Sequence, residues 1–225
     1  MVAVLSGLKT MTDTNSGSLK PAIIFDFDGT IADTFKLSIG IFEKMTKRDK
    51  TFTDEEIERL RSLTGLHVLQ ELHIKPWIVP FMLIRGRTMM RRSLPSIEVF
   101  DGVKLLIADL HNAGTPLFIT SSNSTSNIME FLRERGMDQY FIRVYGNVGL
   151  FGKARVLRKV MTGNRLDPAR TTYVGDETRD IDAAKRVGIR IVSVGWGFNS
   201  ATLLKTHDPD ALANTTAELA SLLHS

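Results

Sequence analysis

Cysteine is absent from this chain of 225 residues, and its absence removes several kinds of chemistry. Without thiols the protein forms no disulfide, binds no zinc or iron–sulfur cluster through thiolates, and has no cysteine nucleophile. A metal ion would therefore be held mostly by oxygen ligands.

Long hydrophobic runs and a strong charge of one sign are also missing. No apolar stretch approaches the roughly 20 residues of a membrane-spanning helix. Residues 1–8 lack the basic start and the long apolar core of a secretory signal. The 29 basic and 25 acidic residues leave a net charge of +4, too small and too scattered to predict a nucleic-acid surface. We therefore expect a cytoplasmic protein that binds neither membranes nor nucleic acid.

Size and hydrophobic pattern predict one core with an insertion. A chain with 43% hydrophobic residues and this length buries one substantial core, but not two large domains. Residues 1–20 are polar and rich in small side chains, which predicts a flexible tail. Helical periodicity over 34–98 predicts an inserted α-helical subdomain, and 21–33 and 99–225 would then form the core.

Strands and helices alternate along the predicted core. This alternation indicates an α/β fold, a doubly wound, Rossmann-like parallel sheet with helices on both faces. The expected strands are 22–25, 116–120, 141–145, 171–174 and 189–194, and the expected helices include 103–110, 154–161 and 181–187.

Two aspartates directly follow the first predicted strand, in the segment Asp26-Phe27-Asp28-Gly29-Thr30. Open α/β sheets bind their ligands at the carboxyl ends of strands. Carboxylates held close together raise each other's pKa unless a metal or a base keeps them charged. One of the pair can then act as a nucleophile while the other transfers a proton. The alternative is a plain Asp-Gly turn after a core strand.

Three later segments place polar residues beyond other strands of the same predicted sheet. Ser121-Ser122-Asn123 offers a hydroxyl group and backbone N–H groups to a phosphate. Lys153 offers a positive charge, and the segment 175–180, Gly-Asp-Glu-Thr-Arg-Asp, offers the carboxylates that Mg²⁺ prefers. Each segment also has a plain alternative: a helix cap for the serines, for Asp176 and for Asp180, and a solvated surface position for Lys153.

In this order the four segments resemble the motifs of the haloacid dehalogenase superfamily. The likeness is to its phosphatase branch with a small helical (C1-type) cap, similar to phosphoglycolate phosphatases. The pattern is DxDxT, then a strand ending in Ser or Thr, then Lys, then GDxxxD, and the resemblance spans about residues 21–223. It implies Mg²⁺-dependent hydrolysis of a small phosphorylated metabolite, a phosphomonoester, through an aspartyl phosphate.

The resemblance also implies roles for single residues. Asp26 would attack phosphorus, and Asp28 would protonate the leaving alcohol and later deprotonate water. Mg²⁺ would be held by Asp26, the Asp28 carbonyl and Asp176. The remaining expected site residues are Ser121, the Ser122 N–H and Lys153 on the phosphate, Thr30 in the loop, and Asp180 as support through water or through Lys153.

The hydroxyl of the second motif has two possible donors, Thr120 and Ser121. We prefer Ser121, because residues 117–120 then fill the strand. Two other functions stay open: a β-phosphoglucomutase-like phosphomutase, and a non-catalytic protein that binds a phosphorylated ligand. An acid at position 28 disfavours dehalogenation, since dehalogenases of this superfamily lack it.

Residues 34–98 match the small helical cap of this branch, and they indicate less about the substrate than the core motifs indicate about the reaction. The cap arginines Arg85, Arg87, Arg91 and Arg92 would bind a second anionic group or form a solvated face. The apolar run 77–84 would pack inside the cap, form a dimer contact or line the substrate site. The oligomeric state is expected to be a monomer or a homodimer.

Overall fold

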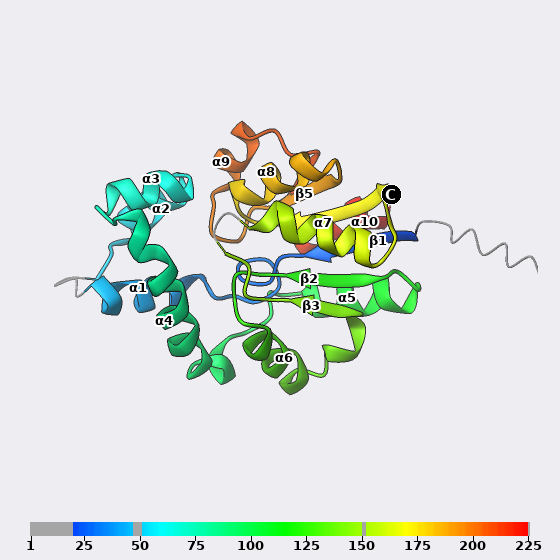
Figure 1. Cartoon of the computed structure of the whole chain (residues 1–225), viewed down its shortest axis with the longest axis horizontal. Helices are drawn as coiled ribbons and strands as arrows, with labels where there is room; N and C mark the ends of the chain where they lie inside the picture. Colours follow the sequence, from blue (N-terminus) through cyan, green and yellow to red (C-terminus); the bar gives the residue numbers. More distant parts are fainter. Residues whose placement is uncertain (1–19, 47–50, 150–151, 225) are drawn as a thin grey trace, which may run out of the picture.

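The described residues form one parallel sheet of six strands. The computed structural model describes residues 20–46, 51–149 and 152–224. The strand order is β3-β2-β1-β4-β5-β6, and every neighbouring pair is parallel (Figure 1). The chain thus builds outward from β1 to one edge and then returns beside β1 to build the other half. The strands are β1 Lys20–Phe25, β2 Leu117–Thr120, β3 Arg143–Tyr145, β4 Leu166–Gly175, β5 Arg190–Val194 and β6 Ala211–Ala213.

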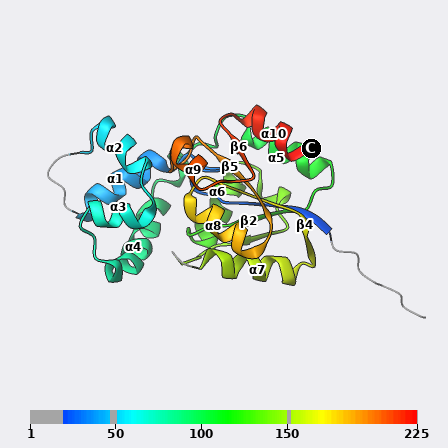
Figure 2. The same ribbon diagram turned by 90° about the horizontal axis from the view of Figure 1, so that it is seen from above.

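Helices cover both faces of this sheet (Figure 2). One face packs against α5 (Val103–Asn112), α6 (Thr125–Glu134) and α10 (Thr216–His224), and the other against α7 (Lys153–Gly163), α8 (Thr178–Val187) and α9 (Ala201–Thr206). Successive side chains of β1 serve opposite faces: Phe25 belongs to the first core and Ile24 to the second. This two-sided burial explains the apolar run before Asp26 and confirms the predicted α/β fold.

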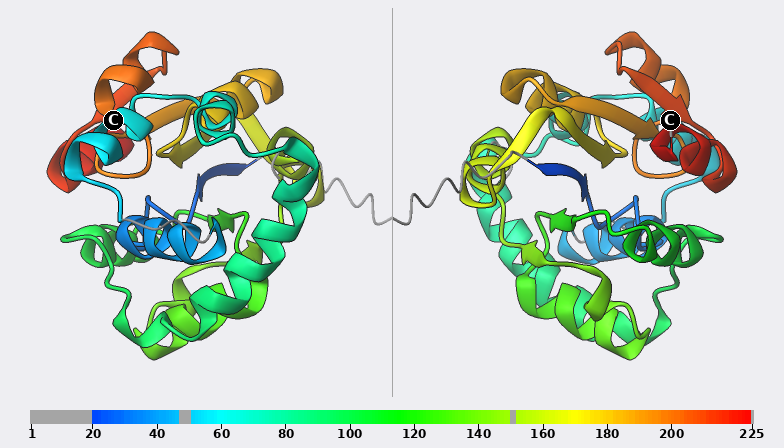
Figure 3. Two further views of the ribbon diagram at one scale, coloured as in Figure 1. Left: turned by 90° about the vertical axis from the view of Figure 1, so that its left-hand side faces the viewer. Right: turned by 90° about the vertical axis from the view of Figure 1, so that its right-hand side faces the viewer.

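A helical insertion lies between β1 and α5. It contains α1 (Phe35–Thr46), α2 (Asp54–Arg61), α3 (Gly65–Glu71) and α4 (Val79–Arg91), with short 3₁₀ turns at Pro76–Ile78 and Leu94–Ser96. Helix α1 packs against α4, and the group stands beside the sheet at the carboxyl ends of its strands (Figures 1 and 3). A capping box opens α2, because Thr53 accepts from the Glu56 N–H at 3.2 Å and Glu56 accepts from the Thr53 N–H at 3.0 Å.

The insertion enters and leaves the core at adjacent points. The Asp33 N–H donates to the Glu98 carbonyl at 2.9 Å, so the two connecting segments run side by side. A further contact comes from α2, where the Arg61 carbonyl accepts from the Ser200 N–H at 2.9 Å. The domain limits expected at 34 and 98 stay a prediction.

Some element bounds differ from those expected from the sequence. Strand β4 starts at Leu166, five residues before the expected start at 171. The sequence does not predict this first part, because it is largely exposed and pairs with β1 only where Leu166 meets Lys20. The short edge strand β6 was not predicted, since Ala-Leu-Ala carries no β-branched residue. The predicted tail 1–20 lies outside the described residues apart from Lys20, where β1 begins. Within the described part of the chain, no helix has the length and apolar character needed to cross a membrane.

Candidate active site

The register of the central strands brings the predicted site segments to one level. Phe25 in β1 is paired with Ile119 in β2 and with Val174 in β4. The next residues along each strand therefore leave the sheet together, at the point where the strand order reverses. Asp26, Ser121 and Asp176 belong to these three segments, and all three are buried.

Lys153 joins two of the aspartates. It is the first residue of α7, and its side-chain nitrogen donates to Asp26 Oδ2 at 2.7 Å and to Asp180 Oδ1. Burial alone would lower the pKa of Lys153, but the charges of Asp180 and Asp26 raise the pKa well above its usual value. The lysine is therefore a fixed positive charge beside Asp26, and the alternative of a solvated lysine is wrong because only 3% of it is exposed.

Asp180 and Asp176 have different surroundings. Asp180 also accepts from the Glu177 N–H at 3.0 Å, which caps the first turn of α8, so the helix-cap reading and the contact with Lys153 both hold. Asp176 does not cap the helix. Its two oxygens accept from Thr30 Oγ1 at 2.8 Å and from the Phe198 N–H at 2.7 Å, which gives Thr30 a place in the loop around the carboxylate.

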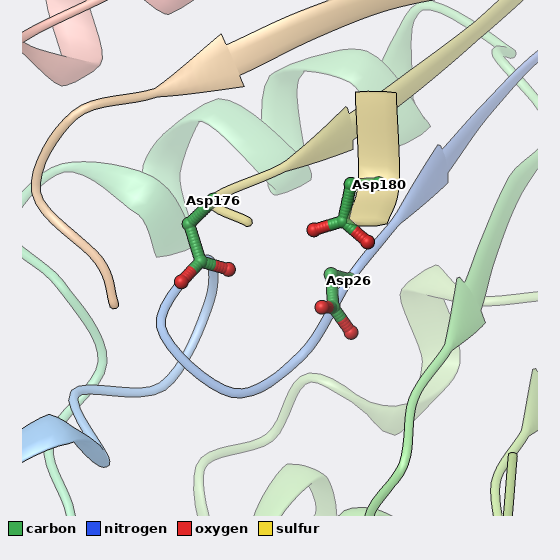
Figure 4. A group of neighbouring side chains, drawn as sticks. All are labelled: Asp26, Asp176 and Asp180. Carbon is green, nitrogen blue, oxygen red and sulfur yellow. The ribbon is translucent and has the colours of Figure 1, made fainter. Parts of the chain in front are cut away.

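Three buried carboxylates form a candidate cation site. Asp26, Asp176 and Asp180 each offer an oxygen, and these oxygens lie within 4.8 Å of one another (Figure 4). Burial and the neighbouring acids Glu177, Asp26 and Asp180 raise the pKa of Asp176 well above its usual value. Burial raises the pKa of Asp26 to about 7, although the charge of Lys153 opposes this change. The three carboxylates share one buried lysine, so the group keeps hard oxygen ligands and an excess of negative charge, which fit Mg²⁺.

Glycine allows the loop to approach this site. Gly29 has φ of +78°, and a methyl group there would collide with the Asp176 carboxylate and the Phe198 ring. A methyl group on Gly197 would also strike Asp176. The Asp26–Thr30 loop and the loop after β5 therefore close tightly around the same carboxylate.

Asp28, two residues after Asp26, contacts the segment after β2. Its Oδ2 accepts from the Ser121 hydroxyl at 3.1 Å and its Oδ1 from Asn123 Nδ2 at 3.2 Å. Burial raises the pKa of Asp28, and the two hydrogen bonds offset this only in part. A carboxyl group with a raised pKa is suited to donating a proton.

The structure separates the two candidate hydroxyls of the second motif. Thr120 is the last residue of β2 and donates to the Tyr173 hydroxyl at 3.2 Å, away from Asp28. Ser121 is turned toward Asp28 and also accepts from the Asn123 N–H at 2.9 Å. Ser122 is half-buried and lines a cavity with Asp28. This geometry favours Ser121 over Thr120 as the hydroxyl facing the site.

Some contacts at the site were not assigned from the sequence. The sequence assigns Asn123 no role of its own, yet its side chain donates to Asp28 and also lies 2.9 Å from Met90 Sδ in α4. Arg179 pairs with Glu177 at 2.5 Å, and its charge lowers the pKa of both Asp26 and Asp28. From the sequence, the one indication of a role for Asn123 and Arg179 was that they lie in the segments 121–123 and 175–180, which lie at the carboxyl ends of β2 and β4.

The four arginines of the predicted cap do not act together. Arg87 Nε donates to the Ser122 carbonyl at 2.7 Å, so this side chain reaches the site. Arg91 instead forms an exposed ion pair with Glu130 at 3.4 Å, and Arg85 and Arg92 are exposed. The solvated-face interpretation therefore fits three of the four arginines, and Arg87 alone of this set contacts the segment after β2.

Comparisons with known proteins agree with this geometry. Residues 23–194 match the model of a family described as haloacid dehalogenase-like hydrolase. A phosphoglycolate phosphatase of Synechococcus elongatus is 33% identical over 207 residues, which cover 88% of this chain and 94% of that protein. A protein of Dickeya dadantii named "Probable phosphatase IndB" is 27% identical and covers 92% of this chain and 95% of its own length.

A solved structure shows the same fold. It is of a predicted phosphatase from Clostridium acetobutylicum, with a TM-score of 0.76, 20% identity, and coverage of 92% of this chain and 99% of that one. The chain belongs to the haloacid dehalogenase-like hydrolases. Within that family, the phosphoglycolate phosphatase homologue indicates that this enzyme is a phosphatase.

Proposed function

We propose that this phosphatase hydrolyses a small phosphomonoester with Mg²⁺, through an aspartyl phosphate formed on Asp26, as a phosphoglycolate phosphatase-like enzyme. The observation that carries the proposal is the position of Asp26 between a buried cation and a potential acid. The side-chain nitrogen of Lys153 donates to Asp26 Oδ2 at 2.7 Å. Asp28, two residues after Asp26, accepts hydrogen bonds from Ser121 and Asn123.

The first half-reaction transfers the phosphoryl group to Asp26. Its carboxylate attacks phosphorus in line with the leaving alcohol, while Asp28 gives its proton to the departing oxygen. In the second half-reaction Asp28, now ionised, takes a proton from water as that water attacks the aspartyl phosphate. Inorganic phosphate leaves, and both aspartates return to their starting forms.

The neighbours of Asp26 would bind the phosphate. The Ser121 hydroxyl, the Ser122 N–H and Lys153 would donate to its non-bridging oxygens. Arg87 supports this role, because its bond to the Ser122 carbonyl orients the backbone that carries the donors. Asp180 would hold Lys153 in position, and Thr30 would hold Asp176.

The acidic cluster supports a role for Mg²⁺. Asp26, the Asp28 carbonyl and Asp176 would hold the ion, and Asp180 would support it from its place on Lys153. Bound there, Mg²⁺ supplies positive charge that offsets the repulsion between the Asp26 carboxylate and the phosphate.

Phosphate release from p-nitrophenyl phosphate and a panel of metabolite phosphates tests the proposal. We expect release that requires Mg²⁺, is abolished by EDTA, and falls to background in Asp26→Asn. Asp33→Asn is the matched control, because Asp33 is an exposed aspartate of the same loop region. Absence of release by the folded wild-type protein with Mg²⁺ would contradict the proposal, and isomerised sugar phosphate exceeding free phosphate would indicate a mutase.

A further inference from the structure

A cavity of about 330 Å³ lies between the helical insertion and the edge of the sheet, and Asp28 opens into it. Its volume is at the lower end of the roughly 300–1,000 Å³ that ligand pockets occupy. Asp26 and Lys153 do not line it, so it extends from the site on the side of Asp28, the expected proton donor.

The floor of this cavity is polar. It is formed by side chains that follow the strand ends, namely Asp28, Ser122, Asn123, Glu177 and Arg179, with Phe198 beside them. Arg179 is paired with Glu177, and Asn123 is bonded to Asp28. Apart from Ser122, these polar side chains therefore already have partners.

The roof of the cavity is hydrophobic. Helices α1, α3 and α4 contribute it, with Ile41, Phe42, Met45, Leu69, Met82 and Leu83 among its side chains. The one cation of the insertion among the cavity's lining residues is Arg87, and it is turned down to the Ser122 carbonyl at 2.7 Å.

We propose that the alcohol of the phosphomonoester is hydrophobic, an aliphatic or ring-bearing group larger than glycolate. The proposal rests on the function proposed above, which places the phosphate on the floor and the departing oxygen beside Asp28. The rest of the alcohol then lies under the roof, where apolar surface is favourably removed from water. A carboxylate or several hydroxyls in that place would lose hydration and would meet only two polar side chains of the insertion, Ser38 and Arg87, the second of which is already bonded to the Ser122 carbonyl.

A series of alkyl phosphates tests this directly. Ethyl, butyl and hexyl phosphate have leaving alcohols of similar acidity, so differences in kcat/KM report binding rather than leaving-group chemistry. We expect kcat/KM to rise along the series, by about fourfold for each buried methylene until the cavity is full. Hexyl phosphate should exceed phosphoglycolate and glycerol phosphate by at least about tenfold.

Two adjacent residues of α4 provide matched variants. Leu83 lines the cavity, whereas its neighbour Ile84 is 62% exposed. Leu83→Asn should reduce the ratio of hexyl to ethyl phosphate kcat/KM by about tenfold or more, and Ile84→Asn should leave it unchanged. If Leu83→Asn fails to fold, Met82→Gln, which keeps the side-chain length, should reduce the same ratio.

The outcomes separate this inference from the proposed function. Phosphoglycolate or glycerol phosphate turned over faster than every alkyl phosphate would overturn the inference and leave the phosphatase function intact. If no ester is hydrolysed, calorimetric binding of ethyl- and hexylphosphonate still tests the cavity. Tighter binding of hexylphosphonate, lost in Leu83→Asn and kept in Ile84→Asn, supports the hydrophobic site, and equal binding overturns it.

Discussion

Asp180 and Lys153 are joined by a buried ion pair in which one oxygen of the aspartate accepts from the lysine ammonium, while the other accepts from the Glu177 N–H at 3.0 Å. The carboxylate thus connects the start of α7 to the start of α8. Lys153 also donates to Asp26 at 2.7 Å. Asp180 therefore helps to position the lysine that contacts the proposed nucleophile.

Asp180→Asn should weaken the hold on Lys153. We expect kcat to fall by about 10–100-fold, the usual effect of changing a residue that orients another at the site. The same substitution at Asp182, which lies on the same helix with its side chain 55% exposed, should leave kcat within twofold, about the spread of exposed positions. Steady-state kinetics on protein checked by denaturant unfolding would decide. A lower unfolding midpoint with unchanged kcat would show that Asp180 acts through stability alone.

Asp176→Asn should change stability and activity in opposite directions. Without metal the Asp176 carboxylate is disfavoured by burial and by Glu177 and Asp26. An amide can keep both contacts, its oxygen accepting from the Phe198 N–H and its nitrogen donating to the Thr30 hydroxyl, so in EDTA the variant should be more stable than the wild type. With Mg²⁺ the wild type should gain thermal stability while the variant gains none and loses phosphate release. An equal Mg²⁺ response in both proteins would contradict the metal assignment.

The stability of the metal-free protein should fall as pH rises through the acidic range. The pKa of Asp26 is raised from 3.8 to about 7, so between these values the folded state holds a proton that the unfolded chain has lost. The free energy of unfolding therefore decreases from about pH 4 to pH 7, by about 2–4 kcal/mol. Denaturant titrations in EDTA would measure this slope. Asp26→Asn should reduce this slope and leave the part contributed by Asp28 and Asp176, whose pKa values are also raised, and a slope unchanged in the variant would contradict the raised pKa of Asp26.

Gly29→Ala should be strongly destabilising. The residue has φ of +78°, and the added methyl group would meet Asp176 and Phe198. We expect a loss of more than about 2 kcal/mol of unfolding free energy together with loss of activity. Gly40→Ala is the control, since a methyl group there meets no atom within 4 Å and the residue lies inside α1, where alanine is preferred by about 0.5–1 kcal/mol. Equal effects of the two changes would argue against close packing at Gly29.

The site residues at the ends of the strands could be predicted from the sequence. Asp26, Ser121 and Asp176 each follow an apolar run, and parallel strands bring such ends to one edge. The contact of Lys153 with Asp26 follows less directly, because it depends on where α7 begins rather than on a strand.

The insertion could not be predicted to the same degree. The sequence gives the run 77–84 one apolar character, but the structure divides it: Met82 and Leu83 line the cavity, while Trp77, Phe81 and Ile84 are 72%, 79% and 62% exposed. Neighbouring residues on a helix face different directions, so the outcome depends on how α4 is rotated against the core. A dimer contact through the exposed side chains stays a prediction.

The polar floor and the hydrophobic roof of the cavity come from different parts of the chain. The roof is drawn from residues 35–91, whose connecting segments meet where Asp33 bonds Glu98, and the floor comes from the strand ends. The choice of alcohol and the breaking of its phosphate ester are therefore separately encoded. An engineer who exchanges the stretch between Asp33 and Glu98 for another of equal span can change what this enzyme accepts and keep how it reacts, as long as the new stretch retains an arginine that bonds the Ser122 carbonyl as Arg87 does.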